Sequence, residues 1–441
     1  ETKSHNNKAV KWKSKGTGNF TISESEKNDR GTTITLFLKD DAKEFLNDWT
    51  IRSTVKKFSD YLEHPVTLIS KTKDEKTQIE EEKEEQINSQ KAIWLRKKSE
   101  VKKDEYNEFY KHLSHDMNNP SEIIHYNAEG AIEFKALLFI PEKRPFDMMT
   151  NHDPKAHLNL YVQRVFISNE FDNLLPGYLR FVKGVVDSSD LPLNVSREIL
   201  QENPLLDKIR TNLVNRIFKT LNQMKEKNYE KFKLFHEEFS SILKEGLQSD
   251  WSNKEKIADL LLFESSSKNA GEKISLSDYV ENMADDQAEI FYLAGESRSQ
   301  IENSPYLEGY KKNKQDVLLM IDPIDDFVIP QLMEYKGKKL KAINKGESSA
   351  KEKSEDEKKV FEGYVGYAKE LLDGVKEVKI TSRLNESAAV LVGDEFSASP
   401  HIEEMMKKMG QPVPERESIL EINPDNKLVQ KAKSLFEKNK D

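Results

Sequence analysis

The sequence of 441 residues contains no cysteine. This absence excludes disulfide bonds, thiol nucleophiles and thiolate metal sites. The nine histidines form no HExxH pair, and no GxxxxGK[ST] phosphate loop is present. The GxSxG elbow of serine hydrolases is also missing. A hydrolase built on a thiol, a metal or a nucleophilic serine therefore finds no support in the sequence.

Long apolar runs are missing as well. No stretch approaches the ~18 apolar residues that a membrane-spanning helix needs, and no apolar leader opens the chain. The formal net charge of −9 argues against a nucleic-acid partner. We expect a cytoplasmic protein with no membrane partner. The first residue is Glu rather than Met, and we expect the chain to be a fragment.

Charged residues are abundant and make up 33% of the sequence. The chain is long enough for two or three domains of ~100–200 residues each. Residues 70–90 are almost entirely polar and cannot bury enough surface to offset chain entropy, so we interpret them as a charged linker. Residues 345–358 are a second charged connection. Before the linker, we predict strands at 19–22, 31–38 and 66–69 and a helix over 45–62.

The block between these two connections alternates strand-like runs with helical patterns, which predicts α/β layers. The strand-like runs are 134–140, 158–167 and 317–321. The longest helical pattern starts at Ser196 and places apolar residues on one face through Leu221. A second helical group contains three phenylalanines, and we interpret its apolar side chains as core. After residue 358, we predict strands at 375–380, 388–392 and 418–422 and a helix at 400–409.

The stretch 191–201, LPLNVSREILQ, reads as an extended loop that turns into a helix. Pro192 keeps Leu191 out of the helical region, and Asn194 or Ser196 is a candidate cap. Arg197 then lies near the positive end of the helix dipole, where a cation is unfavourable unless an anion binds beside it. On the residues alone, an ion pair with Glu198 or with a nearby Asp in 187–190 is the alternative.

Together with 160–167, LYVQRVFI, and 177–190, GYLRFVKGVVDSSD, this stretch closely resembles the middle domain of the ninety-kilodalton heat-shock chaperones, in particular the bacterial HtpG type. The resemblance runs from Trp12 to the last residues. It implies a multidomain α/β chain in four parts. Residues 1–69 would be the end of an α/β-sandwich nucleotide domain, 70–90 the linker, 91–344 an α/β/α layered middle domain, and 345–441 an incomplete, small α+β C-terminal domain.

The resemblance also implies an ATP-dependent chaperone. Arg197 would contact the terminal phosphate of ATP, with Asn194 and Gln201 near it on the catalytic loop. The pocket for ATP and its Mg would lie upstream of Glu1, so we expect this chain alone to be inactive as an ATPase.

Unfolded or partly folded client proteins would be the partners, and the intact protein would be a homodimer. The resemblance places client contacts at Phe146, Phe327, Met405, Met406 and Met409. Phe327 stands where bacterial relatives often have Trp, and Pro330 where they often have Asn. On the residues alone, an ordinary core is the favoured interpretation of the three methionines, because Met readily fills gaps. The alternative function is a nucleotide-independent holdase or scaffold.

Overall fold

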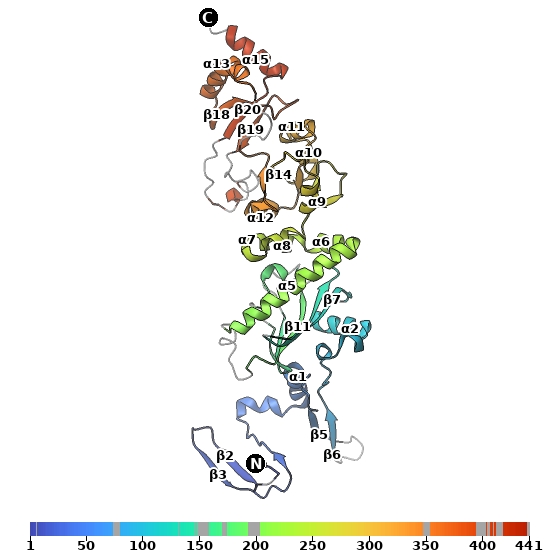
Figure 1. The fold of residues 1–441 in the computed structure, drawn as a ribbon. Coiled ribbons are helices and arrows are strands. Elements are labelled where there is room, and N and C mark those ends of the chain that lie inside the picture. Colours follow the sequence, from blue (N-terminus) through green and yellow to red (C-terminus); the bar gives the residue numbers. More distant parts are fainter. Residues whose placement is uncertain are drawn as a thin grey trace. The chain divides into compact units, whose positions relative to one another are not determined.

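The computed structural model describes residues 1–5, 7–73, 80–130, 132–145, 148, 158–169, 174–192, 203–346, 353–393, 403, 406–408, 410–411 and 418–438 (Figure 1). The chain divides into two compact units. The first comprises Glu1–Lys91 with Arg164–Phe166, and the second comprises Ala92–Gln163 with Ile167–Asp441. Several sheets and helices make the chain mixed α/β, as the sequence predicted.

The first unit begins with a sheet of short strands in the order β3-β2-β1-β4. Its elements are β1 (Thr2–Lys3), β2 (Val10–Ser14), β3 (Phe20–Glu24), β4 (Gly31–Thr32), the 3-10 helix η1 (Asp40–Leu46) and helix α1 (Asp48–Ser59). The strand predicted at 31–38 is wrong beyond Thr32. Ile34 and Phe37 are 79% and 91% exposed, so the alternating pattern buries no face here and has little to stabilise a strand.

The charged segment 70–90 is not irregular where the structure describes it. Strands β5 (Thr67–Lys73) and β6 (Glu80–Gln86) form an antiparallel hairpin, in register from Thr67↔Gln86 to Lys73↔Glu80. The buried Asn88 closes its base, accepting from the Val66 N–H at 2.8 Å and donating to the His64 carbonyl at 3.0 Å. Backbone pairing therefore gives regular structure without a large apolar core. Its role as a linker between domains stays a prediction.

A five-stranded sheet in the order β10-β9-β11-β8-β7 comes next, and all of it except the first two residues of β10 belongs to the second unit. The elements of this part are the 3-10 helices η2 (Ile93–Leu95), η3 (Lys98–Glu100) and η4 (Gly177–Leu179), helix α2 (Lys103–Ser114), and strands β7 (Pro120–Ala128), β8 (Phe134–Pro141), β9 (Asn159–Val162), β10 (Val165–Ser168) and β11 (Lys183–Ser188). The single strand predicted at 158–167 is wrong. It is interrupted at Gln163 and Arg164, whose φ angles of 49° and 68° make a tight turn.

Two long helices, α5 (Pro204–Lys227) and α6 (Tyr229–Lys244), pack on this part of the unit, and their apolar faces enter the main core. Ile209, Leu213 and Ile217 are fully buried, which confirms the predicted helical face. Helix α5 begins at Pro204 rather than at Ser196, because Asn203 caps it and proline is favoured in the first turn. The short helices α7 (Gly246–Ser249) and α8 (Lys254–Ala258) follow, with η5 (Trp251–Asn253) between them.

A six-stranded sheet in the order β13-β12-β15-β14-β17-β16 comes next. Strand β14 is parallel to both of its neighbours, β15 and β17. Ile290 of β14 lies in the main core with helix α12, whereas Phe291 lies in a separate cluster with residues of α10 and α11. Helices thus cover both faces around β14. The elements are β12 (Leu262–Ser265), β13 (Lys273–Ser275), α9 (Leu276–Glu281), β14 (Glu289–Ala294), α10 (Arg298–Glu302), η6 (Pro305–Leu307), α11 (Glu308–Lys312), β15 (Leu318–Met320), α12 (Asp325–Leu332), β16 (Glu334–Tyr335) and β17 (Lys338–Ala342).

The last part of the unit is a three-stranded sheet in the order β18-β20-β19, with helices α13 (Glu355–Leu371) and α15 (Lys427–Lys438). Its strands are β18 (Val375–Ile380), β19 (Ala389–Gly393) and β20 (Ser418–Ile422), which confirms all three predicted strands. Helix α13 was not predicted, and it takes up the end of the supposed connection 345–358. Most of the helix predicted at 400–409 lies outside the described residues.

Candidate functional site

Most of the predicted site residues lie outside the described part of the chain. These are Asn194, Arg197 and Gln201 of the proposed catalytic loop, and Phe146, Met405 and Met409 of the proposed client surface. Phe327 and Met406 are described, and both are half-buried. The described residues therefore show the segments that flank these candidate sites, but only two of the site residues themselves.

The segment that carries Arg197 is attached at both ends to well-packed structure. Before it, Leu191 is buried in the main core, and the Asp190 carboxylate accepts from the Glu133 N–H at 2.7 Å. After it, the side chain of Asn203 accepts from the Leu205 N–H at 3.0 Å and caps α5. Arg197 therefore lies before the N-cap of α5, not in that helix's first turn. Residues 193–202 lie outside the described residues, so the placement of Arg197 at the start of a helix stays a prediction.

The two aspartates proposed as alternative partners of Arg197 have partners of their own. Asp187 accepts from the Trp94 indole N–H at 2.9 Å in a buried contact, and Asp190 holds the Glu133 amide. The first bond fixes the end of β11 to Trp94 near the start of the second unit, and the second fixes Asp190 to the residue just before β8. They show what both carboxylates do in the described structure, and an anion contact by Arg197 stays a prediction.

The proposed client residue Phe327 lies on α12, where it packs against the main core. Its neighbour Asp325 is only 2% exposed and pairs with the buried Lys244 at 2.6 Å. Burial raises the pKa of Asp325 to about 6, although the Lys244 ammonium opposes this shift. Lys244 also contacts Asp322 at 3.2 Å. The acidic start of α12 is thus partly an internal ion-pair cluster, which local sequence patterns could not show because Lys244 lies on α6.

The loop around Phe146 is anchored on both sides by described residues. The Arg144 guanidinium donates to the Glu238 carbonyl at 2.7 Å, and the Arg144 N–H donates to the Glu238 carboxylate at 3.1 Å. Met148 packs against the main core. Arg144 is therefore fixed to α6 and Met148 to the main core, while Phe146 itself lies outside the described residues.

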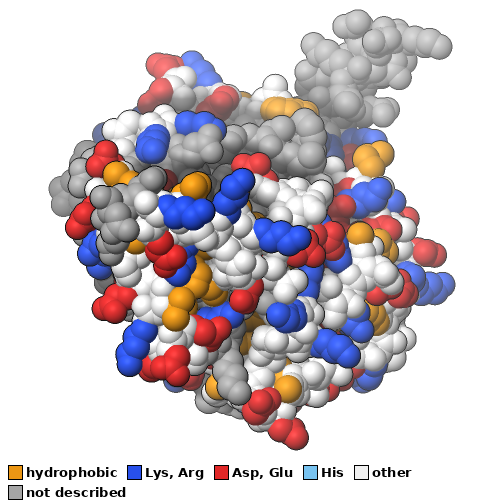
Figure 2. All heavy atoms as spheres, turned by 90° about the horizontal axis from the view of Figure 1, so that it is seen from above, with side chains coloured by type: hydrophobic (Ala, Val, Ile, Leu, Met, Phe, Trp, Pro, Cys, Tyr) orange, Lys and Arg blue, Asp and Glu red, His pale blue; other side chains and the backbone are white. Residues whose placement is uncertain are grey.

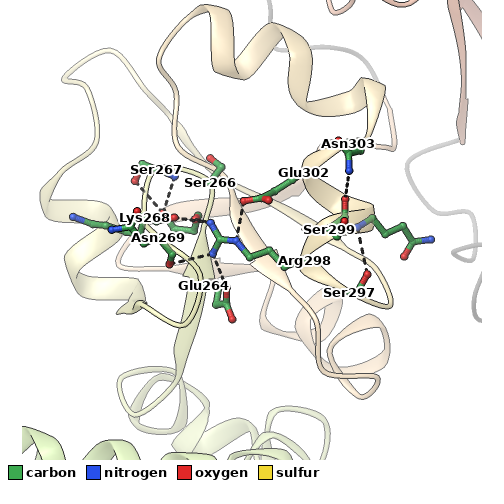
Figure 3. Close-up of polar contacts among 12 residues, drawn as sticks. Glu264, Ser266, Ser267, Lys268, Asn269, Ser297, Arg298, Ser299, Glu302 and Asn303 are labelled. Carbon is green, nitrogen blue, oxygen red and sulfur yellow. Dashed lines mark hydrogen bonds and ion pairs between the residues drawn. The ribbon is translucent and has the colours of Figure 1, made fainter.

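A second polar centre, which the sequence analysis missed, lies at the start of α10 (Figure 3). Arg298 donates to the Glu264 and Glu302 carboxylates at 2.5 and 2.8 Å and to the carbonyls of Lys268 and Ser265 at 2.5 and 3.3 Å. Glu264 comes from β12, so Arg298 fastens the loop after β12 to α10. With these partners, Arg298 has a structural role. Ser297, the N-cap of α10, was the only local sign of this helix start.

Within the described residues, no group of three or more histidine, aspartate or glutamate side chains is arranged to hold a metal ion. None of the helices in the described part combines the length and the apolar content that crossing a bilayer requires.

Comparison with known proteins identifies the class. The family model described as Hsp90 protein matches residues 70–441, and the chain belongs to this family of molecular chaperones. Within the family it is of the bacterial HtpG type. It is 47% identical to the chaperone protein HtpG of Geobacter metallireducens over 98% of this chain and 69% of that protein. Identity to the HtpG proteins of Aliivibrio fischeri and Buchnera aphidicola is 42% and 41%, over 97% and 98% of this chain and 69% and 70% of those proteins.

Proposed function

We propose that this chain takes part in an ATP-dependent chaperone cycle in which Arg197 contacts the terminal phosphate of ATP. The observation that carries the proposal is the identity of up to 47% to HtpG chaperones over nearly the whole chain. The attachment of the loop 191–201 at Leu191 and Asn203 supports it, because both ends leave well-packed structure and limit where Arg197 can reach. A positioned Arg is worth about 10³–10⁵ in rate in phosphoryl-transfer sites.

The proposed donor set fits a phosphate. Arg197 offers a permanently charged planar guanidinium, and Asn194 and Gln201 offer neutral amide donors on either side of it in the sequence. When bound, ATP with Mg supplies a charged terminal phosphate. Arg197 neutralises part of that charge, and the two amides orient the loop around it. No described residue is assigned to the adenine or to Mg, which we place with the nucleotide domain that residues 1–69 would end.

We further propose that client proteins bind along the second unit, at Phe146, Phe327, Met405, Met406 and Met409. Half-buried apolar side chains such as Phe327 and Met406 suit weak, adaptable contacts with many sequences. Figure 2 shows hydrophobic side chains in small groups between Lys, Arg, Asp and Glu side chains over one face. In this proposal the protein is a cytoplasmic homodimer, divided into domains at 69/70, 90/91 and 344/345, with an α/β/α layered middle domain.

The experiment that tests the role of Arg197 uses the protein with its nucleotide-binding part present. In the variant Arg197→Ala, ATP affinity should stay within about twofold while turnover falls by about 10²-fold or more, since the lost contact acts on the reacting phosphate. Lys208→Ala is the matched control, because it removes an exposed cation from the first turns of α5. Equal turnover in Arg197→Ala and Lys208→Ala would remove the phosphate role. Client binding unaffected by ATP would favour the nucleotide-independent holdase instead.

A further inference from the structure

One edge of the three-stranded sheet is open in the described structure. In the order β18-β20-β19, strand β18 pairs with β20 alone among the described strands (Figure 1). The Thr381 N–H donates to the Ile422 carbonyl at 2.9 Å, so residues in step with Thr381 direct their backbone groups to β20. Val378 and Ile380 are out of step with Thr381 and direct theirs to the open edge. Such an edge is a template for a further strand.

A cavity of about 580 Å³ lies along this edge. Residues 377–382 form one wall, and helix α13 forms the other. The helix residues that line it recur at spacings of three or four and therefore share one face of α13: Glu355, Lys358, Lys359, Glu362 and Val365. The cavity is thus a groove between a helix face and a strand edge.

The floor of the groove is apolar. Val378 is only 3% exposed and belongs to a small core with Phe361, while Val365 and Ile380 pack against the same core and are half-buried. Water therefore reaches the edge-facing N–H and C=O groups of Val378 poorly. An added strand would supply hydrogen bonds where water cannot, and buried backbone groups need such partners.

The charges along the groove differ in whether they are already paired. Lys379 of β18 lies 3.9 Å from Glu421. Lys359 and Glu362 are within one turn of each other on α13 and offset each other's charge. The exposed Glu377 has no cation partner within the described part of the chain. The charge available on the strand side of the groove is therefore negative.

We propose that this groove binds an extended segment of a client protein by strand addition to β18. The apolar side chains of the segment lie toward Val365, Val378 and Ile380, and a lysine or arginine side chain lies beside Glu377. Backbone hydrogen bonds give affinity for many sequences, and alternate side chains give selectivity. This inference rests on the proposed binding of unfolded proteins and names how one of their segments is held.

A second copy of this chain suits the groove less well. Its β18 would arrive together with its own α13, a helix of 17 residues, on the same side of the sheet. The cavity of about 580 Å³ is far smaller than a helix of that length. An extended segment without a covering helix is therefore the occupant that fits.

The first test measures selectivity by fluorescence anisotropy with the whole chain and fluorescein-labelled nine-residue peptides. Serine and leucine alternate, with serine at both ends, and the central residue is lysine, glutamine or glutamate. This design puts the leucines on the α13 side and the central residue on the side of Glu377. The lysine peptide should bind about two- to fivefold more tightly than the glutamine peptide, as expected for one exposed cross-strand ion pair. The glutamate peptide should bind most weakly.

Methylation of backbone nitrogens tests the strand addition itself. Only alternate residues of an added strand turn their N–H groups to β18. N-methylation of all leucines or of all serines in the lysine peptide should therefore weaken binding by about tenfold or more for one set and by less than about threefold for the other. The sensitive set shows the direction of the added strand.

Variants assign the selectivity to the groove. In Glu377→Lys, the order of the peptides should invert, so that the glutamate peptide binds more tightly than the lysine peptide. The matched control is Glu370→Lys, the same reversal of charge at an exposed residue of α13 that does not line the groove. The control should keep the preference for lysine, and thermal unfolding should show that both variants are folded.

Three results would overturn the inference: equal binding of the three peptides to the unmodified chain, equal loss from both N-methylated sets, or a lysine preference that survives in Glu377→Lys. Self-association of the chain that Glu377→Lys abolishes in sedimentation would assign the edge to a second copy instead. Failure of the broader proposal has a different signature, because the chain would then bind none of the peptides and would not suppress aggregation of an unfolded protein. Aggregation suppression with equal binding of all peptides would remove only strand addition at β18.

Discussion

At the scale of single residues, buried ion pairs join segments of the second unit that are distant in the sequence. Lys244 pairs with Asp325, Arg298 with Glu264, and Arg383 with Glu421, whose side chains are each 1% exposed. A buried ion pair stabilises a fold little more than a well-packed apolar pair would. Removing one partner, however, leaves an uncompensated charge in the interior. These residues look like ordinary surface charges in the sequence. Their importance appears only when the fold brings both partners together, so the sequence could not have predicted it.

The pair of Lys244 and Asp325 gives the first test. Lys244→Met should destabilise the chain by about 3–5 kcal/mol, because it strands the Asp325 carboxylate in the core. The double variant Lys244→Met and Asp325→Leu should regain most of that loss, since apolar residues of similar size replace both charges. Urea unfolding of the single and double variants measures the two effects. A double variant as unstable as Lys244→Met would show that packing, not the stranded charge, is responsible.

The same pair predicts a pH dependence. The folded state raises the pKa of Asp325 from 3.8 to about 6, so it binds the proton more tightly than the unfolded chain does. Stability from this group is therefore fully present below about pH 4 and is lost as the pH rises through about 6. Between these values, the double variant should gain stability relative to the unmodified chain as pH rises. A constant difference between the two unfolding curves from pH 4 to 7 would contradict this assignment.

At the scale of helices and strands, the sequence predicted what local periodicity encodes. Strands 375–380 and 418–422 were found with their bounds, because both alternate or carry apolar β-branched residues between clear breaks. The turn at Gln163 and Arg164 was missed, since neither residue is the glycine or asparagine that usually marks positive φ. Helix α13 was also missed, although Ser354 and Glu357 form a capping box at its start. The hairpin β5–β6 depends on pairing between strands, which composition alone does not reveal.

The start of helix α5 gives a test at this scale. Asn203→Ala should cost about 1 kcal/mol, because it removes the side-chain acceptor for the Leu205 N–H. Asn203→Asp is the matched control and should retain most of the stability, since aspartate caps equally well and its charge suits the helix N-terminus. Thermal unfolding of the three proteins measures the effect. A loss of similar size in Asn203→Asp would assign the effect to some other contact of this residue.

At the scale of the whole second unit, a compact set of contacts joins the six-stranded sheet to the three-stranded sheet. Arg383 donates to the carbonyls of Ile343 and Gly346, and its own carbonyl lies against Gly309, where a Cβ would approach it to 2.7 Å. The Glu308 carboxylate accepts the N–H groups of Asn385 and Glu386, each at 2.7 Å. Residues that join large parts of the molecule thus lie in loops and helix ends, where sequence periodicity gives no signal.

Glu308 provides the last test. Partial burial alone would raise its pKa, but the hydrogen bonds from Ser387, Asn385 and Glu386 outweigh this and lower it. The charged Glu308 side chain therefore stabilises the fold at pH values above the ordinary glutamate pKa. This contribution is lost as the pH falls through the lowered pKa of the folded state.

In Glu308→Ala, the amides of Asn385 and Glu386 lose their acceptor and should exchange hydrogen about tenfold faster or more near neutral pH, as expected if the lost bonds contribute about 1.4 kcal/mol or more to protection of these amides. Glu308→Gln keeps a carbonyl acceptor without the charge and should show an intermediate rate. Amides in β8, which pair within the five-stranded sheet, should be unchanged in both variants and serve as the internal reference. Equal exchange at Asn385 in Glu308→Ala and the unmodified chain would mean that the three-stranded sheet is held to the rest of this unit mainly by Arg383.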